Sequence, residues 1–166
     1  MNHQALIERS HKQARDKGFW EKPLTFDMAM ALIISEIAEA LEAYRKGRVN
    51  PDWSDTQAVK DSFEVEIADA IIRIYDWCGR HNFELEFIPK TGFQYWNTVD
   101  EGSNFMHLFY TFSHHWSVSE NKECTFETLF NWLMDYSKFH NIDIEKYIMW
   151  KLDYNLNRPY KHGKKF

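Results

Sequence analysis

Apolar residues recur at helical spacing along most of the chain. After Thr25, which has the chemistry of a helix N-cap, they occupy positions 28, 29, 32, 33, 37, 40, 41 and 44, and Gly47 ends the run. Similar spacing predicts five more helices, at residues 3–17, about 54–78, 103–119, 124–140 and 143–155. Gly18 and Gly79 are expected to end the helices that precede them.

Two segments lack this periodicity. Residues 81–102 mix aromatic residues with Pro and Gly, which indicates an ordered connection with at most one short helix. The final eleven residues contain Pro159 and Gly163 and are expected to form an extended tail. Because 166 residues suit one domain with a substantial core, we expect a single all-α domain over residues 1–166.

The composition is consistent with long helices. Only six Gly and four Pro occur, and 44% of the residues are hydrophobic, which disfavours a many-turned β-sandwich. A net charge of −5 argues against a protein that coats nucleic acid. The chain has no run of 18 apolar residues and no apolar segment near its start, so we expect a cytoplasmic protein without a membrane partner. Cys78 and Cys124 lie in apolar helical contexts and are expected to be buried thiols.

Four carboxylates stand in two pairs, each pair three residues apart. Glu36 and Glu39 lie on the helix that follows Thr25, and Glu66 and Asp69 lie on the next one. Residues at i and i+3 share a helix face, with Cβ atoms roughly 5–6 Å apart, so two antiparallel helices would bring both pairs together. Four carboxylates in one place repel unless a cation joins them. Mg²⁺ is the expected occupant, with Mn²⁺ as a substitute.

The alternative is that these acids are solvated residues on helix surfaces. Their neighbours argue against it, because Glu36 and Asp69 stand among isoleucines and alanines. Burying an unpaired carboxylate costs several kcal/mol, so a partner is required. Glu42 and Glu64 look more exposed, and we expect them to be solvated or to support the ligands from outside.

These residues resemble the motifs of the MazG-like all-α nucleoside triphosphate pyrophosphohydrolases, relatives of the dimeric dUTPases. The family's ExxE and ExxD are matched by Glu36/Glu39 and Glu66/Asp69. Residues 14–20 (ARDKGFW) are similar to the family's lead-in to its metal helix, and residues 151–166 (KLDYNLNRPYKHGKKF) are similar to its basic tail. The resemblance covers residues 1–80 and about 125–166. It implies a MazG-like helical bundle in which residues 82–123 are an extra segment, an insertion or a degenerate repeat.

A short internal sequence similarity, called the echo below, motivates the idea of a repeat. Residues 81–86 (HNFELE) resemble residues 140–145 (HNIDIE), and each stretch follows an amphipathic helix. The echo could be the trace of a duplicated helical hairpin, and six similar residues can equally arise by chance. In a duplication, Thr125 and Thr128 match Glu66 and Asp69, so only the first copy would hold a metal.

The resemblance also implies an activity, the Mg²⁺-dependent hydrolysis of nucleoside triphosphates to monophosphate and pyrophosphate. This would be a housekeeping role in the nucleotide pool. Glu36, Glu39, Glu66 and Asp69 would hold the metal, and Glu39 is our choice for the group that activates water. Acids alone repel a triphosphate, so cations must come from elsewhere, and the tail supplies them. The substrate-binding candidates are Lys151, Tyr154, Asn155, Arg158, Lys161, Lys164 and Lys165, with Trp20 as a platform for the base. Arg73 is expected to pair with Asp69 or with a phosphate.

Two other functions stay open. One is a catalytically silent nucleotide-binding or regulatory module on the same fold, and the other is a helical bundle that serves as a protein-interaction domain. The resemblance further implies a homodimer or a higher homo-oligomer. The base and the sugar that the protein prefers depend on the shape of the pocket.

Overall fold

The computed structural model describes residues 1–88, 100–118 and 123–163, and all regular secondary structure in these ranges is helical. The expected all-α class is therefore confirmed. The helices are α1 (His3–Asp16), α2 (Phe26–Arg45), α3 (Thr56–Lys60), α4 (Phe63–His81), α5 (Glu101–Val118), α6 (Glu123–Phe139), α7 (Ile144–Leu156) and the 3₁₀ helix η2 (Tyr160–Gly163). Within the same described ranges, no helix is long and apolar enough to cross a membrane.

The chain divides into two compact units. The first combines Met1–Glu84 with Ile144–Phe166, and the second is Leu85–Asp143. The second unit contains α5 and α6, which pack against each other. The segment that interrupts the first unit therefore extends through α6, beyond the 82–123 that the family resemblance left unexplained.

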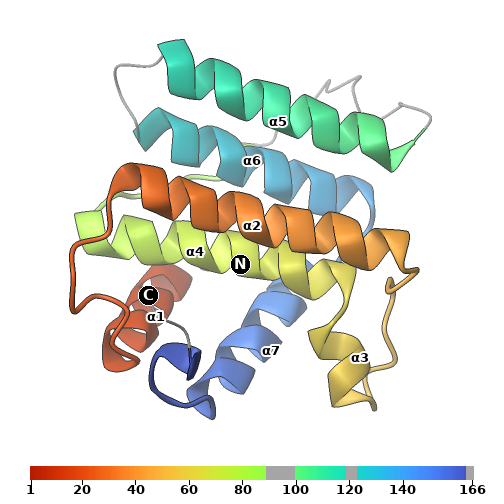
Figure 1. The fold of residues 1–166 in the computed structure, drawn as a ribbon, viewed down its shortest axis with the longest axis horizontal. Helices are drawn as coiled ribbons and strands as arrows, with labels where there is room; N and C mark the ends of the chain where they lie inside the picture. The colour runs from red at the N-terminus through yellow and green to blue at the C-terminus, as the bar shows by residue number, and fades with distance from the viewer. Residues whose placement is uncertain (89–99, 119–122, 164–166) are drawn as a thin grey trace. The chain divides into compact units, whose positions relative to one another are not determined.

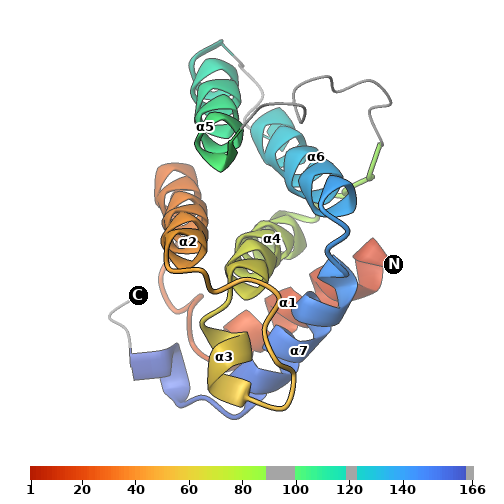
Figure 2. The same ribbon diagram turned by 90° about the vertical axis from the view of Figure 1, so that its right-hand side faces the viewer.

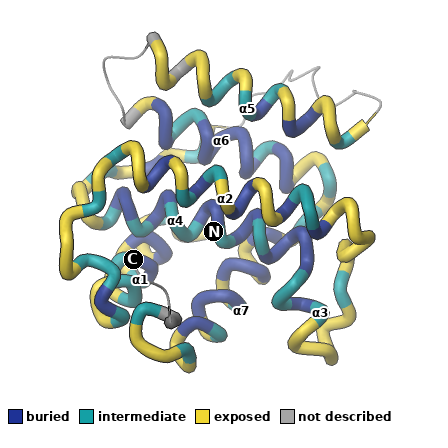
Figure 3. Tube along the Cα trace, in the orientation of Figure 1, coloured by how far each residue is buried: buried dark blue, intermediate teal, exposed yellow. Residues whose placement is uncertain are grey.

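Helix α4 is the centre of the first unit. It packs against α1, α2 and α7, and Figures 1 and 2 show these three helices around it. Its buried residues include Val65, Ile67, Ala68, Ile71 and Ile74, and Figure 3 shows the helix buried along most of its length. Because α4 contacts neighbours on several sides, most charged residues along it are partly shielded from water by adjacent helices.

The helix expected over residues 54–78 is in fact two helices, α3 and α4, so the prediction of one helix was wrong. Asp55 caps the start of α3, since its carboxylate accepts hydrogen bonds from the backbone N–H groups of the first turn. Ser62 caps the start of α4 in the same way. The N–H of Phe63 donates to the carbonyl oxygen of Arg48 at 2.8 Å, which ties the break to the preceding loop.

The end expected at Gly79 was also wrong, because α4 continues to His81. Asn82 ends it in the left-handed conformation, with φ 53°. Glycine is needed at position 79 for helix packing, because a Cβ built there would lie 2.5 Å from the Cβ of His11 on α1. Its lack of a side chain allows α1 and α4 to approach closely.

The other expected helices are confirmed within one or two residues at most ends, including the N-cap at Thr25, whose side chain accepts from the N–H of Met28. The two echo segments also end their helices alike. The N–H of Phe83 donates to the carbonyl oxygen of Cys78, and that of Ile142 to Ser137, both at 2.9 Å. Asn82 and Asn141 are left-handed in both cases. Cys78 is buried as expected, whereas Cys124, at the start of α6, is exposed.

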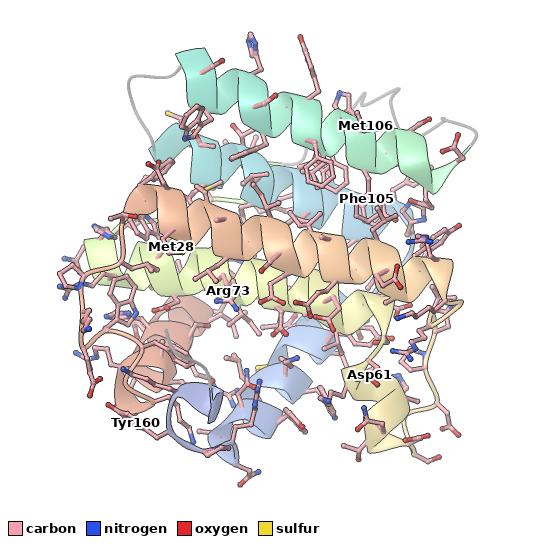
Figure 4. All side chains as sticks on the ribbon, viewed as in Figure 1. Met28, Asp61, Arg73, Phe105, Met106 and Tyr160 are labelled. Atoms are coloured by element: carbon pink, nitrogen blue, oxygen red, sulfur yellow. The ribbon has the colours of Figure 1, made fainter. Side chains whose placement is uncertain are left out.

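The described part of the C-terminal tail is not extended as expected. Residues Tyr160–Gly163 form η2, and the N–H of Lys161 donates to the carbonyl oxygen of Lys17 at 2.9 Å. The hydroxyl of Tyr160, labelled in Figure 4, bonds the carboxylate of Glu21. Gly18 has φ +81°, and a Cβ there would overlap the ring of Tyr160. The tail therefore packs on the connection between α1 and α2.

Candidate metal centre

Helices α2 and α4 bring three of the four predicted ligands together. Carboxylate oxygens of Glu36, Glu39 and Glu66 all lie within 4.8 Å of one another. Glu36 is buried, Glu66 is half-buried and Glu39 is exposed. The i, i+3 spacing places each pair on one face of its helix, and the packing of α2 on α4 turns those faces toward each other.

The fourth acid, Asp69, is held by a cation from the far end of the chain. The Nζ atom of Lys151 on α7 lies 2.5 Å from an Oδ atom of Asp69. Lys151 is only 5% exposed. Burial alone would lower the pKa of Lys151, but the charges of Asp69, Glu66 and Glu36 outweigh burial and raise it. Lys151 is therefore a charged component of the cluster, placed there by the packing of α7 on α4.

A second cation comes from α4 itself. The Nε atom of Arg73 donates to an Oε atom of Glu36 at 2.6 Å, and a terminal nitrogen of Arg73 lies 2.5 Å from the same oxygen. Figure 4 labels Arg73 among the helices of this unit. We expected Arg73 to pair with Asp69 on its own helix or with a phosphate. The pairing with Glu36 instead joins α4 to α2.

The cluster is electrostatically incomplete as it stands. With all four carboxylates ionised, Glu36, Glu39, Glu66 and Asp69 face two cations, Arg73 and Lys151, and the formal charge would be −2. Burial, together with the charges of Asp69, Glu36 and Glu39, raises the pKa of Glu66 to about 8. An ionised Glu66 is thus disfavoured unless more positive charge is present. A set of hard carboxylate oxygens with this charge suits a divalent cation such as Mg²⁺.

Two of the predicted phosphate-binding residues lie beside Lys151 on α7. Asn155, one turn further along, is buried like Lys151. Arg158 is half-buried, and its terminal nitrogen lies 3.4 Å from the side-chain oxygen of Asn155. Lys151, Asn155 and Arg158 therefore follow one another along one side of α7 and its end.

The remaining predicted tail residues lie elsewhere. Tyr154 is half-buried, and its ring stacks on Trp150 at a centroid distance of 5.2 Å. Lys161 forms its ion pair with Glu21 at 2.6 Å, on the connection after α1. Lys164 and Lys165 lie outside the described residues. Among the described tail residues, Lys151 is the one that the structure joins to the acids by an ion pair.

Trp20, the predicted base platform, is half-buried next to the centre. Its indole N–H donates to an Oδ atom of Asp76 on α4 at 2.8 Å. A small hollow of about 20 Å³ is lined by Trp20, Leu24, Ala29, Leu32, Arg73, Asp76 and Trp77. Because Arg73 both lines this hollow and binds Glu36, the hollow adjoins the acid cluster.

Two acids on α4 differ from what the sequence suggested, the buried Glu64 and the half-buried Asp76. Glu64, expected to be exposed, is only 3% exposed, and one of its Oε atoms accepts from the backbone N–H of Asn50 at 2.7 Å, which ties α4 to the loop before α3. Asp76 was not singled out at all. Its position seven residues after Asp69, on the same helix face and within an apolar stretch, is a signal that could have found it.

No protein-family model, no curated protein and no solved structure matches the chain. The chemistry of this centre therefore rests on its own residues.

Proposed function

We propose that this protein is a Mg²⁺-dependent nucleoside triphosphate pyrophosphohydrolase that hydrolyses nucleoside triphosphates to monophosphate and pyrophosphate. The observation that carries the proposal is the meeting of acids from α2 and α4 with a buried lysine from α7. Glu36, Glu39 and Glu66 supply oxygens within 4.8 Å, and Lys151 adds a buried positive charge at Asp69. The same residues carry the resemblance to the MazG-like family.

In this proposal Glu36, Glu39, Glu66 and Asp69 hold the metal. When bound, Mg²⁺ would offset the negative charge of the phosphate oxygens and of the transition state. The protein's own residues keep the other charges in place. Arg73 fixes Glu36, and Lys151 fixes Asp69, so two of the four ligands have little freedom to turn away.

The acids differ in their access to water. Glu39 is the exposed member of the four, whereas Glu36 is buried and ion-paired. We therefore assign to Glu39 the orientation and deprotonation of the attacking water, because water reaches it without displacing a protein side chain. Lys151, Asn155 and Arg158 offer donors along one side of α7 for the phosphate chain. Trp20 lines the same small hollow as Arg73 and offers a ring to the base.

Turnover measured on a panel of ribo- and deoxynucleoside triphosphates with Mg²⁺ tests the proposal. We expect release of pyrophosphate, no release of orthophosphate, and loss of activity in EDTA. Glu39→Gln should abolish turnover while the protein stays folded. Glu42→Gln is the matched control, because Glu42 lies one turn later on α2 in exposed ion pairs with Arg45 and Lys46. Equal activity in Glu39→Gln and wild type would remove Glu39 from the chemistry.

One observation favours a second function, a nucleotide-binding module without turnover. Arg73 and Lys151 already neutralise Glu36 and Asp69, so part of the cluster is satisfied by the chain itself. Nucleotide binding at the same site with no pyrophosphate release on any substrate would establish this function in place of the first.

A further inference from the structure

The carboxylate of Asp76 joins three parts of the chain. One of its Oδ atoms lies 2.8 Å from the Nδ1 atom of His11 on α1 and 2.8 Å from the indole nitrogen of Trp20. His11 and Trp20 precede the first metal helix in sequence, whereas Asp76 lies on the second. All three are in the first unit. The network therefore fastens the segment before α2 to the helix that carries Glu66 and Asp69.

The network is partly shielded from water. The side chains of His11 and Asp76 are 14% and 20% exposed. The Oδ atom of Asp76 accepts from the indole N–H of Trp20 and lies within hydrogen-bond distance of Nδ1 of His11, so both side chains have a defined direction relative to α4. The indole N–H of Trp20 has one hydrogen to donate, so this bond fixes the edge of the ring that faces α4.

Trp20 also contacts three aromatic rings and one cation. Its ring contacts with His11 and His81 are T-shaped, and its contact with Trp77 is tilted at 6.4 Å. The guanidinium of Arg80 lies 5.4 Å from the ring centroid. These contacts surround the ring, and the hydrogen bond to Asp76 is the one that gives its N–H a defined direction.

The position of Trp20 relates it to the acid cluster. The hollow that it lines with Asp76 also contains Arg73, which binds Glu36. Trp20 is therefore linked to the cluster through Arg73. Leu24, Ala29, Leu32 and Trp77 provide apolar walls for the same hollow.

We propose that Asp76 is a positioning residue for substrate binding, which holds Trp20, and with it His11, in the orientation that receives the base of a nucleoside triphosphate. This inference rests on the proposed function and adds a determinant of affinity that acts through Trp20. Asp76 itself contacts neither the metal nor the phosphates.

Two variants separate positioning from simple support of the fold. Asp76→Ala removes both hydrogen bonds, whereas Asp76→Asn keeps an oxygen that accepts from Trp20 and a polar group next to His11. For a nucleoside triphosphate with Mg²⁺, we expect Asp76→Ala to raise KM about tenfold, in keeping with the loss of a stacked base, while kcat stays within about twofold. Asp76→Asn should keep KM near the wild-type value. Inorganic triphosphate, which has no base, should inhibit wild type and both variants equally.

A structural readout accompanies the kinetics. The indole N–H resonance of Trp20, assigned by its absence in Trp20→Phe, should move in Asp76→Ala and stay near its place in Asp76→Asn. An unchanged resonance in Asp76→Ala overturns the positioning, and so does a kcat loss that matches or exceeds the KM change. Equal weakening of nucleotide and inorganic triphosphate also overturns it. A wild-type protein that binds inorganic triphosphate but no nucleotide overturns this inference, and one that binds and hydrolyses neither overturns the proposed function as well.

Discussion

The buried ion pair between Lys151 and Asp69 gives a quantitative test of how the acid cluster is held together. Lys151→Met keeps an apolar stem of similar length on α7 but removes the charge that faces Asp69 at 2.5 Å. The variant leaves Glu36, Glu39, Glu66 and Asp69 with Arg73 as their one paired cation among the described residues. The formal charge of the cluster then changes from −2 to −3.

The expected loss of stability follows from burial. The side chains of Lys151 and Asp69 are 6% and 17% exposed, so water screens the pair poorly. Removing one partner of a buried pair costs about 3–5 kcal/mol, because the other charge stays buried without compensation. We take about 3 kcal/mol, since Asp69 retains some contact with water. For a chain of this length that corresponds to a fall in Tm of about 6–12 °C.

Thermal unfolding in EDTA measures this loss. Lys12→Met is the matched control, because Lys12 pairs with Asp16 at the same 2.5 Å on the exposed face of α1. It should leave Tm unchanged within error, since exposed pairs contribute little. Adding Asp69→Asn to Lys151→Met should restore much of the lost Tm, because it removes the buried carboxylate that has no cation beside it. Mg²⁺ should stabilise Lys151→Met more than wild type, because the variant's cluster is more negative.

The reasoning fails if Lys151→Met and Lys12→Met lower Tm by the same small amount. That result would mean that the pair with Asp69 is solvated in solution. A double variant no more stable than Lys151→Met would contradict the account too, since the loss would then come from packing of α7.

Three further predictions concern the rest of the first unit. Gly79→Ala should destabilise the protein by about 2 kcal/mol in denaturant unfolding, because the new Cβ would lie 2.5 Å from the Cβ of His11. The higher helix propensity of Ala does not offset this overlap, so a stabilised variant would refute the close approach of α1 and α4. Trp53→Ala should lower the free energy of unfolding by about 1 kcal/mol, because it removes a ring whose centroid lies 4.8 Å from that of Tyr147 and 3.6 Å from the ammonium of Lys146. An unchanged free energy of unfolding would show that the loop before α3 is not held on α7. Burial raises the pKa of Asp76 more than its hydrogen bonds with His11 and Trp20 lower it, so the folded chain keeps that proton to a higher pH than the unfolded chain. The contribution of Asp76 to the free energy of unfolding should therefore fall as pH rises above about 4, the pKa of an unfolded aspartate, and Asp76→Asn should become more stable relative to wild type over that range; a constant difference would contradict the raised pKa.

The periodic pattern predicted helices well where each has one apolar face against a neighbour, as in α1, α2 and α7. It failed at residues 61–62 because the apolar spacing continues across the break, while the capping of α4 by Ser62 is a local geometric event. It failed at Gly79 for a different reason. Glycine is needed there because a Cβ would overlap the backbone and side chains of α1, which lie far away in sequence.

In the candidate site, too, the spacing along one helix predicted some features, and the packing between helices decided the others. The spacing of Glu36, Glu39 and Glu66 predicted which faces would meet, because i, i+3 neighbours share a face whatever the fold around them. The choice of partners could not be predicted in this way. Arg73 reaches Glu36 on another helix, 37 residues away, and Asp76 joins residues from two segments ahead of α2. Such pairings depend on the packing of helices, which the pattern of one helix does not specify.

The most direct test of the metal centre is a titration of the protein with Mn²⁺, read by electron paramagnetic resonance as the free ion disappears. We expect wild type and Glu42→Gln to bind the ion alike, and Glu39→Gln and Glu66→Gln to lose that binding while they remain folded. Mg²⁺ should displace the bound Mn²⁺. Binding that survives both Glu39→Gln and Glu66→Gln, or a wild-type protein that binds no ion, would contradict the assignment of these acids as ligands.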